Sequence, residues 1–66
     1  MPVTQALDDH AYRTLAAMAA AELGYYVLLS PHSSRRAKNS GWATPHGVLS
    51  AFGQALFLAE QGRRHS

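Results

Sequence analysis

Residues 7–29 carry apolar side chains at helical spacing on two sides, and this pattern limits the folds open to the chain. The first apolar stripe consists of Leu7, Ala11, Leu15, Met18, Tyr25 and Leu29. The second stripe, on the opposite side at about 100° per residue, consists of Tyr12, Ala16, Ala20, Leu23 and Val27. A helix with two apolar faces needs two neighbours to cover them. We expect one neighbour from the same chain and the other from a second copy, which makes the second stripe the predicted dimer interface.

The sequence predicts a first helix over about residues 5–29. Thr4 is a suitable N-cap, and Pro31 indicates the end, because the residue before a proline avoids the helical region. Gly24 leaves an alternative, in which the helix stops there and residues 25–29 form a short strand of β-favouring residues. Because both apolar stripes continue beyond Gly24, the longer helix is the favoured interpretation.

A polar loop and a second helix follow in the sequence. Residues 30–43 are rich in turn formers, which is typical of a loop. Thr44 followed by Pro45 indicates a helix start and Gly62 a helix end, so the second helix is predicted over about residues 45–61. Its main apolar face consists of Val48, Leu49, Phe52, Leu56 and Ala59.

These elements predict an all-α fold, with residues 1–66 as one domain. The predicted architecture is a helical hairpin that dimerises into a four-helix bundle. A domain of 66 residues buries only about 60% of the surface of its unfolded chain. Small folds gain stability from disulfides, metals or partner chains, and this chain has no cysteine. Association of two copies is therefore the expected source of extra stability.

The composition predicts a folded cytoplasmic protein. Its apolar fraction of 47% and charged fraction of 15% are typical of packed globular chains. The apolar run over residues 15–29 is shorter than the roughly 20 residues that cross a bilayer. The N-terminal region is acidic, which is unlike a secretory signal. We therefore expect no membrane association.

Basic residues gather in the predicted loop and in a basic tail over residues 62–66. In an antiparallel hairpin the tail returns to Asp8 and Asp9, which would partly neutralise it. The loop cluster is open to three interpretations: solvated charges, contacts with nucleic-acid phosphates, or contacts with an acidic protein partner. This cluster consists of Arg35, Arg36 and Lys38.

No motif in the sequence indicates catalysis, a metal or a cofactor. None of the four histidines pairs with another at the spacing of metal ligands on a helix. The aspartates lie far from the serine-rich loop in a hairpin, so no nucleophile has a base and an orienting group nearby. We therefore predict a protein that is not an enzyme and binds no metal or cofactor.

Three large or charged side chains are open to more than one interpretation. Trp42 either covers the end of the core or serves as an exposed anchor for a partner. Phe57 falls among polar residues, so we expect it to stand in water beside Leu58. Glu22 lies within the first stripe, either at its edge or paired with an arginine.

The function predicted from these features is that of a small interaction module. It would act as a homodimer, binding and modulating another protein as an inhibitor or adaptor. The predicted partner-binding residues are Phe57, Leu58, Trp42, Arg35, Arg36 and Lys38. The alternative is a small nucleic-acid-binding regulator that uses the three basic residues of the loop.

Overall fold

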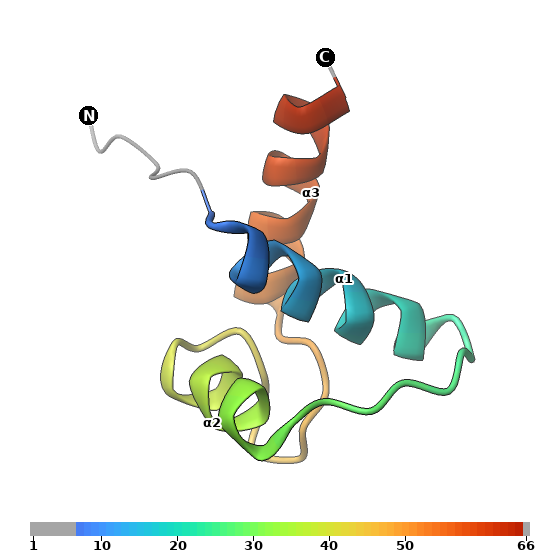
Figure 1. The fold of residues 1–66 in the computed structure, drawn as a ribbon, viewed down its shortest axis with the longest axis vertical. Helices are drawn as coiled ribbons and strands as arrows, with labels where there is room; N and C mark the ends of the chain where they lie inside the picture. The colour runs from blue at the N-terminus through green and yellow to red at the C-terminus, as the bar shows by residue number, and fades with distance from the viewer. Residues whose placement is uncertain (1–6, 66) are drawn as a thin grey trace.

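In the computed structural model, which describes residues 7–65, one helix packs against two others. Helix α1 (Asp9–Glu22) contacts both α2 (Pro31–Asn39) and α3 (Ala51–His65). Figure 1 shows α3 crossing α1, with α2 on the other side of α1. Between α2 and α3 an isolated antiparallel bridge joins Ala43 to Leu49. The fold is all-α, but the predicted two-helix hairpin is wrong: the described chain is a three-helix globule.

The first predicted helix is too long at its C-terminal end. Asp8 caps the start of α1 by accepting the Ala11 amide at 2.7 Å. Gly24, at φ 101°, then ends the helix, because glycine adopts this backbone conformation without strain. Residues 25–30 have no regular structure, so neither the long helix nor the short strand forms. The predicted cap, Thr4, lies outside the described residues.

Residues 31–39, predicted as part of a loop, form α2. Ser30 caps this helix, since its Oγ accepts the Ser33 amide at 3.1 Å, and Pro31 occupies the first turn. Gly41, at φ 79°, lies just after the helix end. The loop prediction was wrong because Pro31 was interpreted as ending a helix, whereas it also fits the first position of the next one.

The second predicted helix begins too early. Thr44 and Pro45 open a turn, in which the Gly47 amide donates to the Thr44 carbonyl at 2.9 Å. The helix starts only after Ser50, whose Oγ accepts the Gly53 amide at 3.0 Å. A proline after a polar residue suits both a turn and a helix start, so this signal did not distinguish them.

Helix α3 also continues past its predicted end. Gly62 lies inside the helix, and residues 63–65 belong to its last turn. The Glu60 carboxylate accepts from Arg63 at 2.6 Å and from Arg64 at 2.7 Å. These pairs join side chains three and four residues apart, which stabilises the last turn. The predicted basic tail is therefore helical through His65.

The core lies where the three helices and the α2–α3 connection meet. Its buried apolar residues are Ala11, Leu15, Met18, Ala37, Trp42 and Leu49. The first apolar stripe is thus confirmed within α1, and outside this helix Leu7 and Leu29 also pack against the core, whereas Tyr25 is exposed. Trp42 is 6% exposed, which confirms the interpretation as a core residue.

A different side of α3 from the predicted one packs against α1. Of the predicted buried face, Leu49 is buried and Leu56 packs against the core, whereas Val48 and Phe52 are 52% and 56% exposed and Ala59 is also exposed. Phe57, expected in water, is half-buried and stacks on Tyr12 with ring centroids 5.5 Å apart. Gly53 is buried, and a Cβ there would collide with the Trp42 carbonyl oxygen. Because α3 starts later than predicted, the small residue Gly53 lies where this helix approaches the Trp42 backbone.

Candidate interaction surface

Four large apolar side chains form an exposed surface at the end of α1 and along the segment after it. Leu23, Tyr25, Tyr26 and Leu28, here called the apolar strip, are 79%, 67%, 87% and 80% exposed. With about 150–250 Å² for each aromatic side chain, the strip exposes on the order of 600 Å². Exposed apolar side chains gathered in one region of a monomer are often part of a binding site.

The backbone turn after α1 creates the apolar strip. The amides of Gly24 and Tyr25 donate to the last carbonyls of α1, which releases the chain from the helix. The following residues alternate: Val27 and Leu29 are half-buried, whereas Tyr26 and Leu28 point outward. This is the two-residue period of an extended strand. Among the described residues, the backbone groups of residues 26–29 have no hydrogen-bond partner.

A shallow pocket of about 350 Å³ lies beside this segment. Met18 on α1, Val27 and Leu29 on the extended segment, and Val48 on the α2–α3 connection line it. Glu22 also lines the pocket and is exposed, as expected for a residue at the edge of the first stripe, and its pairing with an arginine across an interface stays a prediction. The lining is apolar with one carboxylate, a character that suits an apolar side chain better than a polar substrate.

The predicted dimer residues do not form one helical face. Tyr12 stacks on Phe57 inside the molecule, and Ala16 and Ala20 are half-buried on α1. Leu23 is exposed after the end of α1, and Val27 is half-buried in the extended segment. Only the last two lie in or beside the apolar strip. Whether any of these five residues contacts a second copy stays a prediction.

The predicted partner-binding residues are also dispersed. Leu58 is 54% exposed on α3, whereas Trp42 is buried and Phe57 is half-buried against α1. The three basic residues lie together on α2. Their binding to a partner stays a prediction, but Trp42 and Phe57 serve the fold in this structure.

One of the three basic residues of α2 is held by the fold. Arg36 donates to Asp8 at 3.1 Å and to Nδ1 of His10 at 2.9 Å. Its guanidinium also lies 5.3 Å from the centre of the Trp42 ring. The Ala11 amide and Arg36 hold the pKa of the Asp8 carboxyl below its usual range. Arg35 and Lys38 are exposed and form no ion pair within the described residues.

The contact between His10 and Ser33 does not activate a nucleophile. Arginine only donates hydrogen bonds, so Nδ1 of His10 accepts from Arg36 and the ring proton lies on Nε2. Nε2 then donates to Ser33 Oγ at 3.1 Å. A base must instead accept the serine proton. The arrangement joins α1 to α2 and does not activate Ser33.

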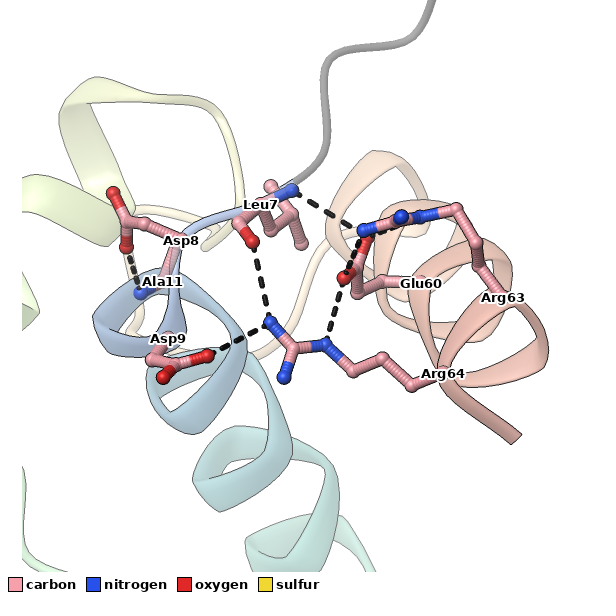
Figure 2. A network of polar contacts seen from close by, with 7 residues as sticks. All are labelled: Leu7, Asp8, Asp9, Ala11, Glu60, Arg63 and Arg64. Carbon is pink, nitrogen blue, oxygen red and sulfur yellow. Dashed lines mark hydrogen bonds and ion pairs between the residues drawn. The ribbon is translucent and has the colours of Figure 1, made fainter. Parts of the chain in front are cut away.

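A polar network around Glu60, which the sequence reasoning missed, joins α3 to the start of α1. Figure 2 shows Arg64 donating both to the Asp9 carboxylate and to the Leu7 carbonyl, at 3.1 Å and 3.2 Å. Glu60 is 5% exposed, and hydrogen bonds from Arg63, and then from Arg64, hold its pKa below the usual range. The contact with Asp9 confirms that the C-terminal basic residues return to the N-terminal acids. The positions of Arg63 and Arg64, three and four residues after Glu60, could have predicted these ion pairs from the sequence.

The described part of the chain contains no group of three or more metal-ligating side chains. Within residues 7–65, no helix has the length and apolar character needed to cross a membrane. Comparison with protein-family models, curated proteins and solved structures finds no match for this chain.

Proposed function

We propose that this protein is a small non-enzymatic interaction module that acts as a homodimer and binds and modulates another protein. The observation that carries the proposal is the apolar strip, with four large side chains at least two-thirds exposed beside an apolar pocket. Exposing an apolar surface of this size to water costs free energy. Binding of a partner that covers it is therefore favourable.

The alternative of a nucleic-acid-binding regulator has less support. Arg36 is neutralised by Asp8, and Arg64 by Glu60 and Asp9. This leaves Arg35 and Lys38 as the basic side chains of α2 outside ion pairs among the described residues. Two phosphate contacts give only weak binding, because both the affinity and its salt dependence grow with the number of phosphates contacted.

The proposal is tested by photo-crosslinking in the host cell. A benzophenone-bearing amino acid in place of Tyr26 should give a discrete heavier adduct on irradiation, because this position is 87% exposed in the apolar strip. The same amino acid in place of Gln54, which is exposed on α3, is the matched control. An adduct at position 26 alone, containing either a second copy of this chain or another protein, supports the proposal. Equal labelling at both positions, or none at position 26, overturns it.

A further inference from the structure

The extended segment after α1 has an unpaired backbone and no feature that protects it from pairing with another strand. Residues 26–29 form no backbone hydrogen bond within the described chain. Natural proteins protect exposed strand edges with lysine, proline, inward charges or bulges. Residues 24–29 contain no charge and no proline. Figure 1 shows this segment running from the end of α1 to the start of α2.

We infer that two copies of this chain pair through residues 25–29 as antiparallel strands, centred on Val27. The inference rests on the proposed interaction function and identifies one partner as a second copy. Backbone hydrogen bonds between the strands would satisfy groups that have no partner in one chain. A strand that adds to an exposed backbone edge is an established mode of recognition.

The sequence of the segment suits pairing with itself. With Val27 facing Val27 of the second copy, Tyr26 faces Leu28 and Tyr25 faces Leu29. Aromatic and aliphatic pairs opposite one another stabilise antiparallel strands, and opposed like charges, which destabilise them, do not occur here. Each outward-pointing Tyr26 then covers an outward-pointing Leu28, the two most exposed side chains of the apolar strip. The inward-pointing residues keep their places beside the pocket.

The register is tested by disulfide trapping, which this chain suits because it has no cysteine. Facing residues in antiparallel strands have Cα atoms about 4.5–5.5 Å apart, which a disulfide spans, whereas diagonal neighbours at about 7–8 Å lie beyond its usual reach. Under mild oxidation of the folded protein, Val27→Cys should form a covalent dimer. Tyr26→Cys alone should not form one, because Tyr26 of one copy lies diagonally across from Tyr26 of the second copy.

A second pair of variants keeps this test independent of changes at Val27, which is half-buried. Tyr26→Cys and Leu28→Cys chains, mixed at equal concentration, should form the mixed dimer in preference to either homodimer. Ala21→Cys, exposed on α1, is the control and should stay monomeric under the same conditions. Equal trapping at all four positions, or trapping at position 21 only, overturns the inference.

Non-covalent association is measured by sedimentation of the unmodified chain over a range of concentrations. A reversible dimer supports the inference, and Tyr26→Lys should raise its dissociation constant at least about tenfold, since lysine blocks edge pairing. Leu58→Lys makes the same kind of change on α3 and should leave the dimer intact. A monomer at every concentration overturns the inference. The proposed function survives that result if position 26 still crosslinks to another protein in cells.

Discussion

At the scale of single residues, whether a glycine tolerates substitution depends on the space that an added Cβ would occupy. Gly53 and Gly62 both lie within α3, and neither has a positive φ. A Cβ at Gly53 meets the Trp42 backbone and the Leu49 side chain, whereas a Cβ at Gly62 has no neighbour within 4 Å. The same residue type therefore serves close packing at one position and has no packing role at the other.

We predict opposite effects of alanine at these two glycines. Gly53→Ala should lower the free energy of unfolding by about 1–3 kcal/mol, the usual cost of overpacking, because the Trp42 backbone cannot move aside easily. Gly62→Ala should raise it by up to about 1 kcal/mol through better helix propensity. Urea denaturation followed by circular dichroism measures both. A stabilising Gly53→Ala would show that α3 does not approach the connection so closely.

At the scale of helices and loops, capping hydroxyls decide where each helix begins. Ser30 opens α2 and Ser50 opens α3, and both accept an amide from three residues ahead. Thr44, which the sequence reasoning chose as a cap, instead accepts the Val48 amide within a turn. Ser50 Oγ has a second role, because it donates to the Gly41 carbonyl at 2.6 Å and so joins the two ends of the α2–α3 connection.

Removing the two hydroxyls therefore distinguishes the observed start of α3 from the predicted one. Ser50→Ala should cost about 1–2 kcal/mol of unfolding free energy, as expected for loss of an N-cap. Thr44→Ala should cost less than about 0.5 kcal/mol, because only one exposed hydrogen bond is lost. Thermal unfolding of the two variants shows which substitution costs more stability. A larger loss at Thr44 would restore the earlier helix start.

At the scale of the whole molecule, charged contacts join the first and last helices. Glu60 on α3 accepts from the Leu7 amide at 3.4 Å as well as from the arginines, and Arg64 connects it to Asp9. Arg64 also lies 4.3 Å from the Tyr12 ring centre. Because Asp8 and Glu60 both have a lowered pKa, protonating either carboxyl favours the unfolded chain.

Stability should therefore depend on pH in the acid range. A carboxyl whose folded pKa is lowered stabilises the fold above its unfolded pKa, and this contribution disappears as the pH falls towards the folded value. The melting temperature should be steady above about pH 5 and fall below about pH 4, where free carboxyls titrate. Glu60→Gln should lower the melting temperature at pH 7 and flatten this fall. Glu22→Gln, at an exposed position, is the control, and an equal flattening there would contradict the assignment to Glu60.

The sequence by itself determined the helical class, the buried side of α1 and the meeting of the N-terminal acids with the C-terminal arginines. The burial of Ala11, Leu15 and Met18 was predicted from periodicity, because apolar residues at successive helical turns favour a buried side. The contact between Arg64 and Asp9 was expected from the return of the tail in a hairpin, and it forms although the fold is a three-helix globule instead.

Only the tertiary structure decided where α2 and α3 begin and which side of α3 packs inward. Pro31 and Pro45 each follow a hydroxyl residue, yet Pro31 opens a helix and Pro45 lies in a turn. The difference arises because the Ser50 amide donates to the Trp42 carbonyl at 2.7 Å, a contact that exists only once the chain has folded back on itself. The same local capping signal is compatible with a helix start or with a turn. Long-range hydrogen bonds decide which of the two structures forms. The exposure of the apolar strip has the same origin, since it depends on where α1 stops and on what packs beside it.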